Sequence, residues 1–224
     1  MQFFAEQGLL ADISDVWNEI GDQYDNSYKI ASTGLDGKQY FVPQSWYPWG
    51  LHYRKSMVKE LGLDPENIGN FDDMIKMFEA MKKKGLVGFA AGDKGGWEAM
   101  GTFDIINARV NGYQFHVDLL AGREKWTDQR VIDVFKQWEL LLPYTNKNVL
   151  DLEWDGAMQL LLQKKAGSTL MGSWFGGNFK EKSQEDYDDL WIVPFPEINP
   201  EHGVDTIDAP VSYTHLRAHE TKAN

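Results

Sequence analysis

The sequence predicts an α/β fold, in which helices alternate with the short strands of a mostly parallel sheet. Three observations lead to this prediction. Apolar residues recur at helical spacing over segments such as 71–81 and 127–142. Short apolar runs such as LVGFAAG, residues 86–92, separate the helical segments and are typical of buried strands. Proline or glycine follows most of these runs and ends them.

The N-terminal part of the chain predicts one short helix and one strand. Residues 8–22 begin as a loop and continue as a helix with a single apolar face. Asp36 and Gly37 predict a turn. The β-branched and aromatic run 40–42 predicts a strand that Pro43 ends.

Strand and helix then alternate. Residues 51–65 predict the end of a strand followed by a helix that Gly62 terminates. Asn70 is suited to cap the next helix, and Gly85 closes that helix before the strand at 86–92.

The second half continues the pattern. A helix over 100–111 is expected to end at Gly112, and a longer helix to run from a cap at Thr127 to Leu142. A further helix is predicted over 154–165. The remaining predicted strands are STLMGSW, residues 168–174, and DLWIVPFPE, residues 189–197.

Composition narrows the class of protein. The chain has 224 residues, of which 42% are hydrophobic, so it can bury a substantial core. It has no apolar run long enough for a bilayer, and its start lacks the basic and apolar regions of a secretory signal. A formal charge of -12 argues against a nucleic-acid partner. The absence of cysteine excludes disulfides and thiolate metal sites, and fits a cytosolic or an exported protein.

The usual signatures of enzymes are absent from the sequence. Outside residues 211–224 the histidines are His52, His116 and His202, far apart and without ligand spacing. The motifs of zinc proteases, α/β-hydrolases, P-loop proteins and dinucleotide-binding folds do not occur. We therefore expect no catalytic residue, no metal site and no cofactor.

Aromatic side chains are the informative excess, at 13% of the chain with nine tryptophans. Several lie in turns beside glycine or proline at predicted strand ends, where ligands bind in α/β sheets. Indole rings stack on the C–H faces of sugars while nearby polar groups accept hydroxyl hydrogen bonds. The alternative, that these rings only pack beneath loops, stays open. The rings concerned are Trp46, Tyr47, Trp49, Trp97, Trp174 and Phe175.

A glycoside hydrolase is the rival interpretation. It would need two carboxyl groups at a set separation across a sugar, one with a pKa raised by burial. Glu98 and Asp104, close to Trp97, are the candidate pair.

The last residues, VSYTHLRAHETKAN (211–224), depart from the pattern of the chain. They lack core periodicity and are less acidic than the rest. SYTHLRAHET resembles a translated sequencing adapter, so we exclude 211–224 from the fold and the function, and with it the His215 and His219 pair as a metal site. A native polar tail is the alternative.

Several segments, in order, resemble the extracellular solute-binding proteins of ABC importers, in the carbohydrate-binding group related to maltose-binding protein. These segments are QGLLADISDVW, DGKQYFVPQSWYPWGLHYRKSMVKELGLD, NFDDMIKMFEAMKKKG, ARVNGYQF, MGSWFGGNF and LWIVPFPE. They cover residues 3–210. One departure is Arg54-Lys55, where the family usually has Asn-Lys after the tyrosine.

The resemblance implies a periplasmic-binding-protein-like (type II) two-lobed fold, truncated at both ends. Residues 1–49 would be a remnant of the N-terminal lobe with the first hinge crossing, and 50–208 the C-terminal α/β lobe. Residues 209–224 would hold a stub of the second crossing and the foreign tail. Ligand sits between the lobes of such proteins, and closure about the hinge buries it.

The resemblance also implies a function and a set of contacts. The protein would capture a sugar or oligosaccharide and deliver it to ABC permease subunits, as a monomer without enzymatic activity. The full-length parent would be extracytoplasmic, either periplasmic or a lipoprotein at the cell surface. Trp174 is the first expected contact and Trp49 is expected to pack. The other expected contacts are Trp46, Tyr47, Trp97, Glu98, Phe175 and Asn178. A third possibility is that this chain is a broken reading frame that binds nothing.

Overall fold

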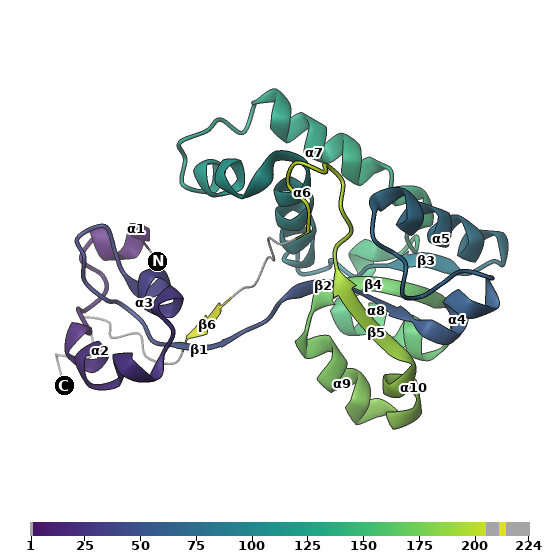
Figure 1. The fold of residues 1–224 in the computed structure, drawn as a ribbon, viewed down its shortest axis with the longest axis horizontal. Coiled ribbons are helices and arrows are strands. Elements are labelled where there is room, and N and C mark those ends of the chain that lie inside the picture. The colour runs from purple at the N-terminus through teal and green to yellow at the C-terminus, as the bar shows by residue number, and fades with distance from the viewer. Residues whose placement is uncertain (1, 205–210, 214–224) are drawn as a thin grey trace. The chain divides into compact units, whose positions relative to one another are not determined.

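The computed structural model describes residues 2–204 and 211–213, with side chains except those at 2, 3, 27, 44–46 and 211–213. The chain forms two compact units (Figure 1). One comprises residues 1–47 with 210–224, and the other residues 48–209.

The smaller unit has three helices and a two-stranded sheet among its described residues. Its core joins Ile13, Trp17 and Val42, and the Trp17 indole Nε1 donates a hydrogen bond of 2.9 Å to the Phe41 carbonyl. Because this buried N–H has a partner, burial of the ring does not carry the penalty of an unpaired donor. The elements are α1 (Gln2–Glu6), α2 (Ser14–Ile20), α3 (Asn26–Ser32), β1 (Pro43–Trp46) and β6 (Val211–Tyr213), with a 3₁₀ turn at Gly21–Gln23.

Two sequence predictions are wrong in this unit. Residues 40–42 do not form a strand. Their apolar side chains are buried, but burial alone does not pair their backbone with another strand. Pro43 begins β1 instead of ending a strand, a position where its missing N–H costs little. β6 pairs antiparallel with β1, so residues 211–213 take part in this small sheet, while the foreign origin of 211–224 stays a prediction. Backbone hydrogen bonds make such pairing largely independent of side-chain identity. Residues 214–224, with His215 and His219, lie outside the described residues.

The larger unit is built on a four-stranded sheet with the order β3-β4-β2-β5. β3 and β4 are parallel, whereas β2 runs antiparallel to both β4 and β5. The prediction of a mostly parallel sheet holds for β3, β4 and β5, which run in one direction, and fails for β2. The sequence locates the strands but carries no signal for the direction of β2 between its neighbours. The strands are β2 (Trp49–Arg54), β3 (Val87–Ala90), β4 (Ala166–Gly172) and β5 (Leu190–Pro194).

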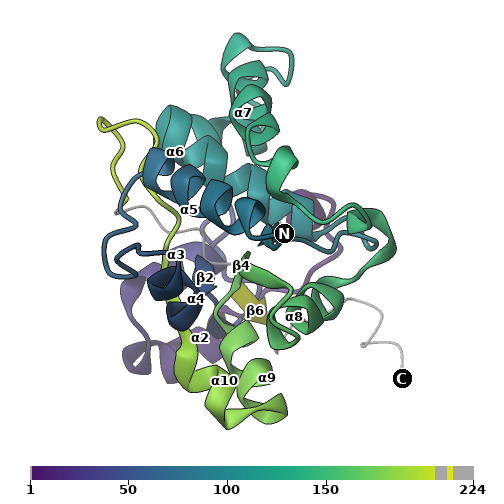
Figure 2. The same ribbon diagram turned by 90° about the vertical axis from the view of Figure 1, so that its right-hand side faces the viewer.

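Helices cover both faces of this sheet. Figures 1 and 2 show α5 and α6 on one face and α8, α9 and α10 on the other. Side chains alternate along β2, so Leu51 and Tyr53 enter one helical layer while His52 and Arg54 enter the other. The helices are α4 (Lys55–Glu60), α5 (Phe71–Lys83), α6 (Glu98–Leu120), α7 (Gln129–Glu139), α8 (Trp154–Leu162), α9 (Trp174–Lys182) and α10 (Gln184–Asp189), with 3₁₀ turns at Leu142–Tyr144 and Val149–Asp151.

Local signals for the helix ends are mostly confirmed. The Asn70 side chain accepts a hydrogen bond from the Asp73 N–H and caps α5 as predicted. Asp128, and not Thr127, caps α7. α6 passes through Gly112, whose φ of 82° interrupts it, so the predicted end at this glycine is a kink between two helical segments. The His202 ring lies 2.8 Å from where a Cβ on Gly112 would be.

Candidate functional site

The candidate site lies at one edge of the larger unit's sheet. β3 and β4 are parallel and end at this edge, and Trp49 at the start of β2 pairs with Gly172 at the end of β4. α6 and α9 both begin just beyond these strand ends. Ligands of α/β proteins bind beyond the carboxyl ends of strands, so this edge is where a site is expected.

Three tryptophans from separate elements meet there. Trp49 and Trp174 have ring centroids 5.4 Å apart, and Trp97 lies 6.1 Å from each of them. We call this trio the tryptophan cluster. Trp49 is 2% exposed, which confirms that it packs, whereas Trp97 and Trp174 are half-buried. Trp49 thus supports two rings that keep part of their surface accessible.

Glycines make room for the cluster. A Cβ on Gly101 in α6 would lie 2.6 Å from the Trp49 indole, and a Cβ on Gly172 would overlap the six-membered ring of Trp174. The two rings can therefore lie directly against backbone. This close approach explains why glycine stands at these two positions.

The loop before α6 holds Trp97 in place. The Asp93 carboxylate accepts a hydrogen bond of 2.9 Å from the Ala99 N–H, which satisfies a free donor at the start of α6. The Lys94 N–H donates to the Leu152 carbonyl at 2.9 Å. The loop is thus tied both to α6 and to the segment that leads into α8.

A pocket of about 270 Å³ lies at the ends of β3 and β4, and its lining includes Glu98, the residue after Trp97. Its floor is formed by the ends of β3 and β4, and its walls by α6, α7 and the segment after α7. Most of the lining is apolar, and the polar side chains in it belong to acids and threonines. The lining residues are Phe89, Ala90, Ala91, Gly92, Asp93, Glu98, Ala99, Thr102, Trp138, Leu142, Thr145, Val149, Leu150, Thr169, Leu170 and Met171.

Glu98 is the unusual group in this pocket. Its residue is 6% exposed, and Oε1 accepts a hydrogen bond of 3.0 Å from the Trp154 N–H. Among the described residues Oε2 is buried without a hydrogen-bond partner. Burial raises the pKa of this carboxyl above its usual value, and the nearby carboxylates of Asp93 and Glu153 act in the same direction. A buried acceptor without a partner is costly, so this oxygen is suited to a ligand donor.

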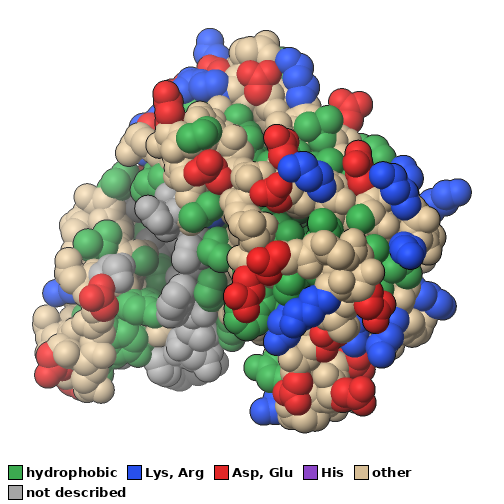
Figure 3. Space-filling view, turned by 45° about the vertical axis from the view of Figure 1, so that its right-hand side comes forward, with side chains coloured by type: hydrophobic (Ala, Val, Ile, Leu, Met, Phe, Trp, Pro, Cys, Tyr) green, Lys and Arg blue, Asp and Glu red, His purple; other side chains and the backbone are tan. Residues whose placement is uncertain are grey.

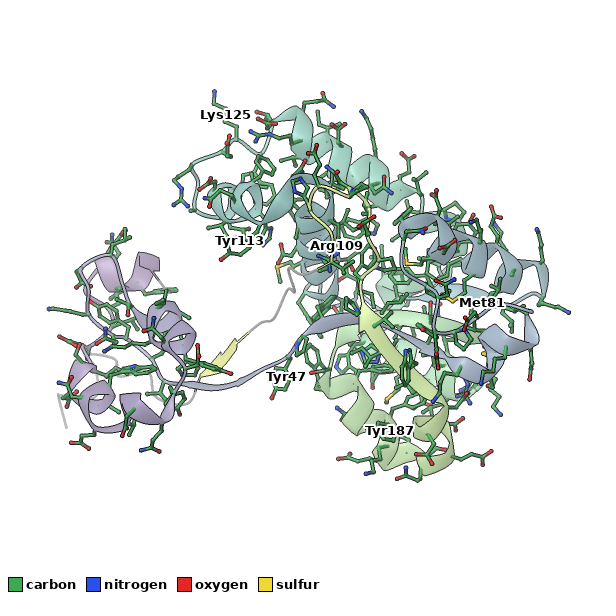
Figure 4. All side chains as sticks on the ribbon, in the orientation of Figure 1. Tyr47, Met81, Arg109, Tyr113, Lys125 and Tyr187 are labelled. Atoms are coloured by element: carbon green, nitrogen blue, oxygen red, sulfur yellow. The ribbon has the colours of Figure 1, made fainter. Side chains whose placement is uncertain are left out.

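The structure sorts the other expected contacts. Phe175 is fully buried between His52 and Phe179, so it lies in the core and is withdrawn from the candidate contacts. The Asn178 amide donates to the Trp174 carbonyl at 3.1 Å, within the first turns of α9. Tyr47 is half-buried in the smaller unit and is labelled in Figure 4. The ring of Trp46 lies outside the described side chains.

The carboxyl pair of the rival interpretation does not come together. Glu98 and Asp104 both lie on the first segment of α6, six residues apart. Six residues correspond to about 9 Å along a helix and roughly 240° around it, so the two carboxyls point to different sides. Burial raises the pKa of Asp104 to about 6, but Glu98 does not face it. This geometry lacks the opposed carboxyls that glycoside hydrolysis needs.

Two other features of the described residues bear on the class of protein. None of their helices combines the length and apolar character that a bilayer crossing requires. Histidine, aspartate and glutamate side chains in the described part do not gather in threes as metal ligands.

The fold and the position of the tryptophan cluster at the strand ends are typical of proteins that bind a ligand at this edge of an α/β sheet. The chain belongs to the bacterial extracellular solute-binding protein family, whose model matches residues 1–215. This result and the structural similarities below confirm the predicted family and the predicted type II periplasmic-binding-protein-like fold. Members of the family serve as binding components of ABC transporters.

Individual relatives agree with this assignment. An uncharacterized ABC transporter extracellular-binding protein of Pyrococcus horikoshii, PH1214, is 27% identical over 221 residues, which are 97% of this chain and 50% of the relative. The solved bacterial solute receptor AcbH is 40% identical with a TM-score of 0.77, over 95% of this chain and 53% of AcbH. AcbH is described as having an exclusive substrate preference for β-D-galactopyranose.

A third similarity concerns the fold alone. A chitin oligosaccharide binding protein superposes with a TM-score of 0.81 at 24% identity, over 96% of this chain and 53% of that protein. The chain thus spans about half the length of the relatives it matches.

Proposed function

We propose that this chain is the sugar-capturing part of an extracytoplasmic solute-binding protein, which delivers a sugar or oligosaccharide to the permease of an ABC importer. The observation that carries the proposal is the tryptophan cluster at the strand ends, with the unpartnered Glu98 carboxylate oxygen beside it. Family membership and the sugar preference of the 40% identical AcbH support it.

The chemistry of the cluster suits a pyranose ring. Trp97 and Trp174 offer partly exposed indole faces on which the C–H face of a sugar can stack. Trp49 holds these rings from behind. Glu98 Oε2 would accept a hydrogen bond from the ligand, and a charge-assisted bond of this kind is stronger than one between neutral groups.

The remaining expected contacts have different roles in this proposal. Asn178 acts indirectly, because its amide binds the backbone that carries Trp174. Trp46 and Tyr47 stay proposed as contacts from the smaller unit.

The protein would bind its ligand and release it unchanged. The separation of Glu98 and Asp104 along α6 argues against hydrolysis. The charge of -12 disfavours nucleic acid, and acidic and basic side chains are interspersed on the face shown in Figure 3. We propose a monomer, in the periplasm or anchored by lipid at the cell surface, where family members act.

Calorimetric titration of the purified chain with a panel of sugars tests this function. Trp174→Ala is expected to weaken sugar binding by about 1–3 kcal/mol, which is about five- to 150-fold, because it removes a stacking surface. Trp191→Ala is the matched control, since Trp191 is 41% exposed on β5 and lies away from the cluster. Equal affinities of the wild type and Trp174→Ala would remove Trp174 from the site. Release of reducing sugar from a polysaccharide panel would favour the hydrolase instead.

A further inference from the structure

The pocket and the tryptophan cluster draw on the same segments of the chain. Pocket residues and cluster contacts are neighbours in the sequence at three places. Glu98 follows Trp97, Thr102 follows the glycine that lies against Trp49, and Met171 precedes the glycine that lies against Trp174. A ring on the cluster and a substituent in the pocket would thus contact the same three segments of the chain.

The lining of the pocket does not suit an unsubstituted sugar. Its walls are formed largely by alanine, valine, leucine, methionine and phenylalanine side chains, and at its mouth Leu142 and Leu150 are 56% and 74% exposed. Hydroxyl groups placed against such walls would lose water without gaining partners, which is unfavourable. An apolar group would instead gain from burial there. The volume of about 270 Å³ is close to the lower end of ligand pockets and exceeds the needs of a single methyl group.

Few polar atoms of the pocket remain open to a ligand. The Thr169 hydroxyl donates to the Ala90 carbonyl at 2.8 Å, and the Thr102 hydroxyl donates to the Glu98 carbonyl at 3.2 Å. Asp93 accepts the Ala99 N–H. Glu98 Oε2, buried and without a partner among the described residues, is the acceptor that a ligand can still satisfy. A ligand donor next to an apolar group would match this arrangement.

We propose that the ligand is a saccharide with an N-acyl substituent, whose ring stacks on the tryptophan cluster while its acyl group enters the pocket and its amide N–H donates to Glu98 Oε2. This inference rests on the proposed sugar-binding function and specifies its ligand class. A free amine is a poorer match, because its charge would lose hydration among apolar walls. A hydroxyl could reach Glu98 but would leave the walls unfilled.

Two matched pairs of sugars test the proposal on the wild-type chain by calorimetry. They are galactose with N-acetylgalactosamine and glucose with N-acetylglucosamine, so the effect of the acyl group is measured apart from ring stereochemistry. Burial of the methyl group and one hydrogen bond predict that the N-acetyl sugar binds about tenfold more tightly within at least one pair. Equal or weaker binding of the N-acetyl sugar in both pairs would overturn the proposal.

Variants locate the effect in the pocket. Val149 is half-buried and lines the pocket, so Val149→Phe fills the pocket. The N-acetyl sugar should then bind this variant about as tightly as the unsubstituted sugar. Glu98→Gln should also reduce the N-acetyl preference, because the acceptor loses its charge. Leu120→Phe adds similar bulk at an exposed position at the end of α6 and should keep the preference. A preference that survives Val149→Phe would place the acyl group elsewhere and contradict the proposal.

Two further outcomes separate this proposal from the function on which it rests. Tighter binding of galactosamine or glucosamine than of their N-acetyl forms would assign Glu98 to a cationic ligand and overturn the N-acyl proposal, while sugar binding itself stands. If no sugar of any kind binds, the proposed function fails together with the inference.

Discussion

Replacing Gly172 by alanine would insert a methyl group into the space that the Trp174 indole occupies. The new Cβ would overlap the six-membered ring, so the indole would have to swing away from the end of β4. It would then lose its edge contact with Trp49 at 5.4 Å and its tilted contact with Trp97 at 6.1 Å. Aromatic pairs contribute about 0.5–1.5 kcal/mol each, so we expect a loss of about 1–3 kcal/mol in the free energy of unfolding. The usual cost of overpacking is of the same size.

Urea unfolding followed by circular dichroism measures this loss, and tryptophan emission reports the displaced ring. Gly177→Ala is the matched control, because no atom lies within 4 Å of its new Cβ and the residue is in the interior of α9. Alanine there should stabilise the protein by about 0.5–1 kcal/mol. Sugar affinity should fall at least about tenfold in Gly172→Ala, since the stacking face moves. A Gly172→Ala variant with wild-type stability and emission would refute the argument that this glycine seats Trp174.

Two further predictions concern His52 and Arg54, which enter the helical layer formed by α8, α9 and α10. The Arg54 side chain is 3% exposed and forms ion pairs with Asp186 at 2.5 Å and Asp189 at 3.1 Å. Arg54→Met should lower the free energy of unfolding in urea by about 3 kcal/mol, because the two carboxylates lose their cation. Unchanged stability would contradict this role. Burial lowers the pKa of His52 to about 4, below its unfolded value near 6.5, so the unfolded state takes up the proton first as the pH falls. Stability should decrease from pH 6.5 to about 4 with a slope of up to about 1.4 kcal/mol per unit, and His52→Phe should flatten this slope. An equally steep slope in the variant would exclude His52 as its source.

Local signals in the sequence were sufficient for most elements. The Asn70 cap acts within one turn of chain, so its effect can be inferred from neighbouring residues, whereas Gly112 was expected to end a helix that continues beyond a kink. Trp49 was expected to pack, and the structure places it at the buried start of β2. The direction of β2 could not be inferred in this way, because it depends on how distant strands assemble.

The candidate site also depends on how distant parts of the chain assemble. Trp174 and Phe175 are adjacent in GSWFGG and look alike in the sequence, yet the first turn of α9 directs one to the cluster and the other into the core. The pocket was missed altogether. Its lining comes from β3, β4, α6, α7 and the connecting segments, and its longest continuous run, residues 89–93, supplies only five of the lining residues. Glu98 was expected from the resemblance, but only the structure shows that one of its oxygens lacks a partner.

Nuclear magnetic resonance of the indole N–H groups, during titration with sugar, tests the central claim most directly. The signals of Trp97 and Trp174, assigned with single-site variants, should shift on saturation. Trp17, buried in the core of the smaller unit, and Trp191 on β5 should keep their positions. Sugar binding that leaves the Trp97 and Trp174 signals unchanged would contradict a site at this edge of the sheet.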